Sequence, residues 1–290
     1  MTGSSSSIIG VDLGGTKTAL ARFDAKTFET LEEERMETHA DREFPHVLDD
    51  LVCLIEKIKT EDTIAVGIGV PGLVKQPEGN IVRLPNIPGA EGVDLKKQLE
   101  DRLKLPVEVD NDANCFALAE ARFGSGKNHK VVVGITMGTG VGGGIVVDGK
   151  IFGGNQGFAG EVGHMLLKPG EPPFETDDKR GDIEQFFSGT AMGKRCNEAK
   201  RPEDYLEGEV CGFLQPAIFR EVAWMCTDLV HLLDPSVIVF GGSAGRALEP
   251  HLKEINVELK QWVLPGTPLP ELAIAVLDDA AIRGAALLVN

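Results

Sequence analysis

The alternation of apolar runs and amphipathic segments along this 290-residue chain predicts a mixed α/β fold. Runs rich in β-branched residues are typical of buried strands, and they occur at 63–70, 107–109, 237–240 and 272–277. Helical spacing or composition predicts helices at 47–58, 115–123, 216–233 and 279–289. The stretch 151–215 is expected to be rich in loops, with no regular element in its polar part, 168–180.

Residues 8–23 and 131–147 each predict a β-hairpin with a glycine-rich tip. Glycine lets backbone N–H groups approach an anion, and threonine hydroxyls at both tips add donors. The spacing Gly138-x-Gly140-x-x-Gly143 matches the dinucleotide fingerprint by letter, but a β-branched run follows it where that fingerprint must open a helix. The two tips therefore suggest a polyphosphate site, and ordinary glycine hairpins are the alternative.

Two polar groups are candidates for chemistry. Asp112 lies among acidic and amide residues, 110–114, that follow a short strand and precede a helix, so it could act as a general base or as the helix N-cap. Glu161 and His164 are three residues apart after a glycine-rich loop, so both could face one ligand if that stretch turns helically. The alternative is a structural histidine and a solvated glutamate.

Composition narrows the class of protein. The 29 basic and 45 acidic residues give a net charge of −16, which disfavours binding to nucleic acid and to anionic membranes. The length suggests two domains. The five scattered cysteines contain no C-x-x-C and are expected to be reduced. No export segment or run of 18 apolar residues is visible, so a cytoplasmic location is expected.

Seven strings, in order, resemble the motifs of the ROK family (repressor, open reading frame, kinase) of the actin-like ATPase and sugar-kinase superfamily. They are Asp12-Leu13-Gly14-Gly15-Thr16-Lys17, Gly69-Val70-Pro71-Gly72, Leu84-Pro85-Asn86-Ile87, Asn111-Asp112-Ala113-Asn114, Gly138-Thr139-Gly140-Val141-Gly142, Gly160-Glu161-Val162-Gly163-His164 and Val239-Phe240-Gly241-Gly242. The resemblance implies two RNase H-like (actin-like ATPase) domains with a cleft between them, over 8–120 and 121–290. The last helix, 279–289, is expected to pack on the first domain. A homodimer is also implied.

The same resemblance implies a role for each matching residue. Asp112 becomes the catalytic base, and Asp12 an indirect ligand of Mg²⁺ through water. The implied sugar ligands are Asn86, Asn111, Asp112, Glu161, His164 and Glu184. The implied ATP contacts are Asp12, Gly14, Gly15, Thr16, Lys17, Gly138, Thr139, Gly140, Gly241 and Gly242.

One segment departs from the family pattern. Many relatives carry a C-x-C-G-x-x-G-C cluster between the equivalents of His164 and Glu184, which closes a structural zinc site with that histidine. Residues 165–183 contain no cysteine, and their carboxylates do not replace thiolates in a closed tetrahedral site. We therefore expect no zinc, which leaves His164 to contact sugar.

The resemblance implies an ATP-dependent hexose kinase acting on the 6-hydroxyl of an aldohexose, with glucose favoured. Kinases for N-acetylmannosamine, N-acetylglucosamine, mannose or fructose share these motifs, and some relatives use polyphosphate as donor. A sugar-sensing repressor of this family would need a DNA-binding domain before the hairpin that begins at Ile8. A non-catalytic binding protein is the remaining alternative, and it would not need Asp112, Glu161 or His164.

Overall fold

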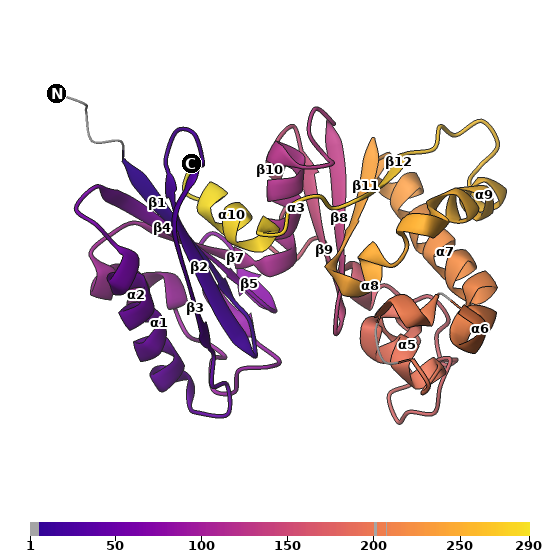
Figure 1. Ribbon diagram of the computed structural model, residues 1–290, viewed down its shortest axis with the longest axis horizontal. Coiled ribbons are helices and arrows are strands. Elements are labelled where there is room, and N and C mark those ends of the chain that lie inside the picture. Colours follow the sequence, from indigo (N-terminus) through magenta and orange to yellow (C-terminus); the bar gives the residue numbers. More distant parts are fainter. Residues whose placement is uncertain (1–5, 200–201, 207) are drawn as a thin grey trace. The chain divides into compact units, whose positions relative to one another are not determined.

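The computed structural model describes residues 6–199, 202–206 and 208–290, and the chain divides into two compact units (Figure 1). The first unit contains the chain up to Ala119 together with Phe152–Ala159 and Leu277–Asn290. The second contains Glu120–Ile151 and Gly160–Val276. The chain first passes from one unit to the other between Ala119 and Glu120, and its final helix belongs to the first unit. The sequence did not indicate that 152–159 also belongs there.

The first unit is built on a five-stranded sheet with the order β3-β2-β1-β4-β7. Its strands are β1 (Ser7–Leu13), β2 (Lys17–Asp24), β3 (Thr30–Glu37), β4 (Thr63–Val70) and β7 (Val107–Asn111), and β5 (Leu73–Lys75) pairs with β6 (Asn80–Arg83). The helices are α1 (Phe44–Ile58), α2 (Leu95–Leu103), α10 (Ala280–Leu287) and the start of α3 (Asp112–Phe123). β1 and β2 form the expected hairpin, and β1, β4 and β7 run parallel.

Helices cover both faces of this sheet because successive residues of a strand point to opposite sides. Ile9 and Val11 of β1 pack in one core with apolar residues of α1 and α2. Gly10 between them faces α10, where a Cβ would lie only 2.1 Å from the Ile282 carbonyl oxygen. Glycine is therefore required for α10 to pack directly on β1 and β4.

The second unit repeats this strand arrangement, with the order β10-β9-β8-β11-β12. Its strands are β8 (Val131–Met137), β9 (Val141–Val147), β10 (Lys150–Ile151), β11 (Val237–Gly241) and β12 (Glu271–Ile274). The helices are α4 (Glu184–Phe187), α5 (Gly189–Arg195), α6 (Gly208–Cys211), α7 (Gln215–Leu233), α8 (Gly242–Arg246) and α9 (Leu252–Trp262), with 3-10 turns at Val162–His164, Pro202–Tyr205, Gly212–Leu214 and Glu249–His251. In each unit a glycine hairpin supplies two adjacent strands, and two parallel strands follow (Figure 1).

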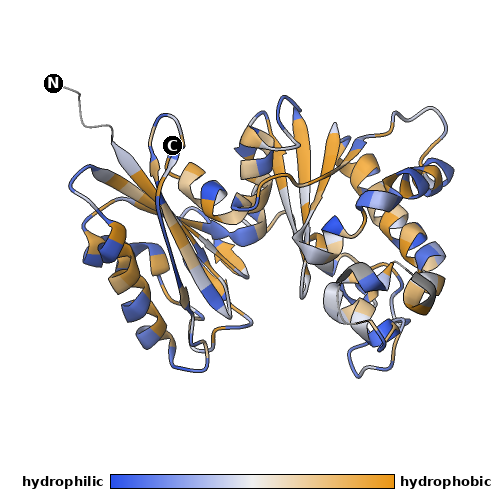
Figure 2. Ribbon diagram, in the orientation of Figure 1, coloured by the Kyte–Doolittle hydropathy of each residue, from blue (hydrophilic) through white to orange (hydrophobic). Residues whose placement is uncertain are grey.

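The pattern of apolar residues predicted most of these elements. Figure 2 shows apolar residues along the central strands of both sheets and mixed polarity around the helices. Both hairpins and the strand 63–70 lie where expected, and three helices begin one to three residues before their expected starts. The last strand ends at Ile274, three residues before its expected end at 277, and β3, α2 and α9 were not predicted. Residues 165–183 contain no helix or strand, as expected for 168–180.

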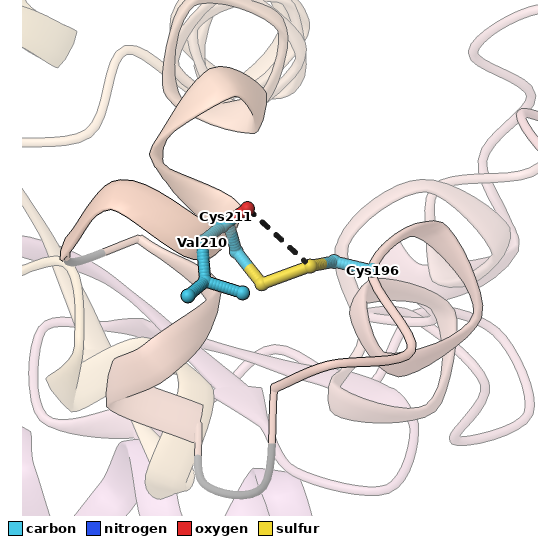
Figure 3. The surroundings of a disulfide bond; sticks show 3 residues. All are labelled: Cys196, Val210 and Cys211. Atoms are coloured by element: carbon cyan, nitrogen blue, oxygen red, sulfur yellow. Dashed lines mark hydrogen bonds between the residues drawn. A yellow bond between two sulfur atoms is a disulfide. The ribbon is translucent and has the colours of Figure 1, made fainter.

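The expectation of five reduced cysteines is wrong for two of them. Cys196 follows α5 and Cys211 ends α6, and their sulfurs form a disulfide with the Cα atoms 6.0 Å apart (Figure 3). Both cysteines are buried in the core that contains α5 and α6, and this packing brings together residues 15 apart in sequence. Cys53, Cys115 and Cys226 are thiols.

No helix among the described residues is long and apolar enough to cross a membrane.

Candidate functional site

Three carboxylates gather at the carboxyl edge of the first unit's sheet. Asp12 on β1 pairs in register with Gly69 on β4, and Gly69 pairs with Asp110 on β7, so these positions align across parallel strands. Asp112 follows two residues later. The buried Cys115 thiol has a pKa raised well above its ordinary value, first by burial and then by the carboxylates of Asp110, Asp112 and Asp12. All three carboxylates therefore lie near this one thiol.

Asp12 directly precedes the tip of the first hairpin. The Gly14 N–H donates to the Lys17 carbonyl oxygen at 3.1 Å and closes the turn, while Thr16 and Lys17 are exposed at its tip. Burial raises the pKa of Asp12 from 3.8 to about 6. A nearby cation would relieve this penalty, and carboxylate oxygen is a ligand that Mg²⁺ prefers. Asp12 therefore suits a magnesium site beside the hairpin.

Asn111, and not Asp112, caps α3. The Asn111 Oδ1 accepts hydrogen bonds from the N–H groups of Ala113, at 2.8 Å, and Asn114, at 3.2 Å, as an N-cap does. Its Nδ2 donates to the Gly72 carbonyl oxygen at 3.0 Å. These bonds leave Asn111 one amide N–H for the sugar contact that the resemblance implies. The cap alternative for Asp112 is therefore wrong, because the preceding residue fills that position.

Asp112 is the first residue of α3 and is half-buried. Its Oδ1 accepts from the Ala113 N–H at 2.8 Å. The neighbouring Asp110 is buried and its Oδ1 accepts from the Asn111 N–H, at 2.7 Å, and from the Asn114 Nδ2, at 2.8 Å. Asp110 thus orders the start of the helix, while Asp112 is more exposed than Asp110.

Asn86, the other sugar-ligand candidate of this unit, lies beside the first hairpin. A Cβ placed on Gly15 would come within 2.6 Å of the Asn86 Cβ. This contact brings a residue expected to bind sugar next to a tip expected to bind phosphate, although 71 positions separate them in the sequence.

The tip of the second hairpin is held by the segment that contains α4 and α5. The Glu184 Oε2 accepts from the Val141 N–H at 2.9 Å. The Gly189 N–H donates to the Gly138 carbonyl oxygen at 2.8 Å, and the Thr190 hydroxyl donates to the Thr139 carbonyl oxygen at 2.7 Å. Glu184 therefore orders the hairpin that contains Gly138, Thr139 and Gly140, a role that the sequence did not indicate.

Glu161 and His164 lie in the same region of the second unit, close to Glu184. Burial raises the pKa of Glu161, the charge of His164 opposes that rise, and the carboxylate of Glu184 adds to it. The His164 Nδ1 lies 3.2 Å from the Oδ2 of Asp182, a buried carboxylate. The three expected sugar ligands of this unit are thus neighbours.

Gly241 and Gly242, the expected adenosine contacts, lie beside the second hairpin. Gly241 ends β11 and pairs with Thr136 on β8, and α8 begins at Gly242. This strand-to-helix turn therefore stands next to the strand that leads into the tip of the second hairpin.

The loop that departs from the family pattern is ordered by its own side chains. Arg180 forms an ion pair with Asp178, and Gln185 accepts from the Gly181 N–H at 2.7 Å and donates to the Asp178 carbonyl oxygen at 3.0 Å. In the described part of the chain no three His, Cys, Asp or Glu side chains are grouped as metal ligands. The expected lack of zinc stays a prediction.

The profile of the ROK family matches residues 8–290, and the chain belongs to this family. It is 33% identical to the N-acetyl-D-glucosamine kinase of Photobacterium profundum, with 96% of this chain and 98% of that protein covered. The ROK hexokinase of Thermus thermophilus superposes with a TM-score of 0.79 at 30% identity, covering 97% of each chain.

A second solved structure is the ROK family glucokinase of Streptomyces griseus in complex with glucose and AMPPNP. Its TM-score is 0.76 at 31% identity, with 97% of this chain and 98% of that chain covered. The resemblance drawn from the seven strings is therefore confirmed, and so is the α/β fold with two actin-like ATPase units.

Proposed function

We propose that this chain is an ATP-dependent hexose kinase that transfers the γ-phosphate to the 6-hydroxyl of an aldohexose, with glucose as the first candidate. It is a sugar phosphotransferase of the ROK family, in line with the relatives named above. The observation that best supports the proposal is the carboxylate group of the first unit. Asp112 stands at a helix start that Asn111 already caps, beside Asp12 and a phosphate-type hairpin.

Asp112 is the proposed general base. Phosphoryl transfer needs positioning, charge neutralisation and one acceptor for the proton of the attacking hydroxyl. As the bond from the sugar oxygen to the γ-phosphorus forms, the bond from that phosphorus to the bridging oxygen breaks and ADP leaves. The hydroxyl proton passes to the Asp112 carboxylate.

The remaining residues bind and orient. Mg²⁺ would be held through water by Asp12, and it would neutralise charge on the phosphates. Backbone N–H groups at Gly15–Lys17 and at Thr139 and Gly140 are the proposed phosphate donors, and Gly241 with Gly242 the proposed adenosine contacts. The N–H groups of Gly14 and Gly138 close their own turns, so these two glycines would shape the tips. Glu161, His164, Asn86 and the remaining N–H of Asn111 would contact sugar hydroxyls.

N-acetylglucosamine is the second candidate substrate. The relative from Photobacterium profundum, a kinase for that sugar, is 33% identical to this chain, whereas the glucokinase of Streptomyces griseus is 31% identical. This difference is too small to choose a sugar. Both hexoses carry the same 6-hydroxyl, so the proposed mechanism applies to either.

The test is ADP release from ATP and Mg²⁺ with glucose, N-acetylglucosamine, N-acetylmannosamine, mannose and fructose offered separately. Turnover with glucose supports the first candidate, and preference for N-acetylglucosamine by kcat/KM selects the second. Calorimetry with the same sugars tests the alternative that the chain is a non-catalytic binding protein. Sugar binding without ADP release by folded protein would contradict a kinase function.

A further inference from the structure

We propose that Asp182 is a positioning residue that fixes the ring of His164 for sugar binding. The inference rests on the proposed function, because it assigns a task to a residue outside the expected ligand set. Its basis is the contact between the Asp182 Oδ2 and the His164 Nδ1, 3.2 Å apart. The Asp182 side chain is 1% exposed, whereas that of His164 is 49% exposed. The buried carboxylate thus holds one ring nitrogen, while about half of the histidine side chain is accessible.

The backbone fixes where Asp182 lies. The Ile183 N–H donates to the Met165 carbonyl oxygen at 2.9 Å, and the Leu167 N–H donates to that of Gly181 at 2.9 Å. These bonds join the two ends of the loop 165–183 directly beside His164. Ile183 is 1% exposed and anchors this pairing in the core. Asp182 therefore lies on a backbone segment that hydrogen bonds hold beside the histidine.

The chemistry of the pair determines the tautomer of the ring. An ionised carboxylate only accepts hydrogen bonds, so the Nδ1 must carry the proton that it shares with Asp182. In the neutral ring the Nε2 then has its lone pair available to accept a hydrogen bond from a sugar hydroxyl. Without the carboxylate, the ring would be able to rotate and to place its proton on either nitrogen.

Other charged groups surround this pair. The Arg180 Nη1 forms an ion pair with the Asp182 Oδ2, 3.4 Å away. Glu161 and Asp178 both interact electrostatically with His164. Of these three acidic residues, Asp182 is the one that is hydrogen-bonded to the ring. The Asp178 carboxylate bonds to Arg180 instead.

The matched variants are Asp182→Ala, Asp182→Asn and Asp178→Asn. Asp182→Ala removes the acceptor, and Asp182→Asn retains a neutral, weaker one. Asp178→Asn removes another carboxylate of the same loop. The Asp178 carboxylate also pairs with Arg180, but it does not touch the histidine ring. If Asp182→Ala does not fold, the comparison of Asp182→Asn with Asp178→Asn still decides the question.

The first readout is the ¹⁵N NMR spectrum of histidine-labelled protein at about pH 8.5, where ordinary histidine rings are neutral. The signal is assigned with His164→Gln. We expect the Nδ1–H tautomer in the wild type and in Asp178→Asn, and a mixture of tautomers in Asp182→Ala. A wild-type ring protonated on Nε2, or an unchanged tautomer in Asp182→Ala, would overturn the proposal.

The second readout is steady-state kinetics with the sugar that the wild type uses. We expect KM for sugar to rise about 10-fold to 100-fold in Asp182→Ala and less in Asp182→Asn, with KM for ATP unchanged. Equal changes in both KM values would indicate a merely structural role. An inactive wild type would contradict the proposed function. The NMR readout needs no turnover, so it would still test the contact between Asp182 and His164.

Discussion

Asp112 can lose its charge without loss of the helix start, because Asn111 provides the cap of α3. We predict that Asp112→Asn lowers kcat by about 10² to 10⁴, the usual contribution of a positioned general base. The measurement is kcat at saturating sugar and ATP, with circular dichroism and thermal unfolding as checks of the fold.

The control for this variant is Asp101→Asn, which changes an exposed carboxylate on α2. It should leave kcat unchanged. Near full turnover in Asp112→Asn would exclude Asp112 as the base and would direct attention to Asp110 or Asp12.

Asp12 should reduce the stability of the protein when no cation is present. Burial raises its pKa to about 6 in the folded state from an ordinary 3.8, so folding favours the protonated form. The free energy of unfolding should therefore fall as the pH rises from 3.8 to about 6. This change corresponds to at most about 3 kcal/mol.

The variant Asp12→Asn has no such titration. We expect it to be more stable than the wild type at pH 7.5, with a gain that shrinks below pH 6 and disappears as the pH approaches 3.8. Urea unfolding at several pH values, without nucleotide or divalent cations, measures this difference. A gain that does not depend on pH would show that burial of the charge is not its cause.

The candidate residues differ in how far sequence alone could identify them. Asp112 was proposed as the base from the family resemblance, because the stretch 110–114 contains two acidic residues and its composition alone left a helix cap as the alternative. The cap role of Asn111 was not proposed, since it depends on which residue begins the helix. Asp182 was missed as a partner of His164 because 17 residues separate them and the contact depends on how the loop ends pair.

Strands and helices also differ in how far sequence alone could predict them. Buried strands such as β4 and β8 were predictable, since their apolar runs reflect burial on both faces of the sheet. β3 was missed because it is an edge strand whose sequence, TLEEERME, is mostly exposed. α2 was missed because its buried face consists of only Leu95, Leu99 and Leu103 in an otherwise charged segment.

The second hairpin is bonded to Glu184 of α4, and Gly140 lies close to that carboxylate. A Cβ at this position would lie 2.3 Å from the Glu184 Oε2. Gly140→Ala should therefore displace the carboxylate and break its bond to the Val141 N–H. We predict a loss of about 1.5–3 kcal/mol of stability, the range for a hydrogen bond to a charged group.

Gly138→Ala is the matched substitution, because no heavy atom lies within 4 Å of a Cβ at that position. It should change the free energy of unfolding by less than about 0.5 kcal/mol. Urea unfolding of both variants makes the comparison. Equal losses would indicate that backbone conformation, and not contact with Glu184, makes Gly140 necessary.

The disulfide should stabilise the segment that joins α5 to α6. When the protein is denatured without a reducing agent, we expect three reactive thiols, those of Cys53, Cys115 and Cys226. After reduction we expect five. The double variant Cys196→Ala/Cys211→Ala should lose about 3 kcal/mol, as expected for a closed loop of about 15 residues. Cys53→Ala, at an exposed position, is the control. Five reactive thiols before reduction would contradict the bond.

The charge of the entire chain bears on the phosphate donor. The formal net charge is −16 at pH 7, and polyphosphate is a long polyanion that such a field repels. ATP with Mg²⁺ carries far less charge and needs only the short-range donors of the hairpins. The chain therefore suits a compact nucleotide better than an extended polymer.

We accordingly predict turnover with ATP and little or none with inorganic polyphosphate at equal phosphate concentration. Coupled detection of the sugar phosphate measures both donors with the same assay. Raising the ionic strength from about 0.01 M to 0.15 M shortens the screening length from about 30 Å to 8 Å. If net repulsion is the barrier, any residual polyphosphate activity should rise with salt. Activity that is equal for both donors at low salt would mean that local basic groups outweigh the net charge.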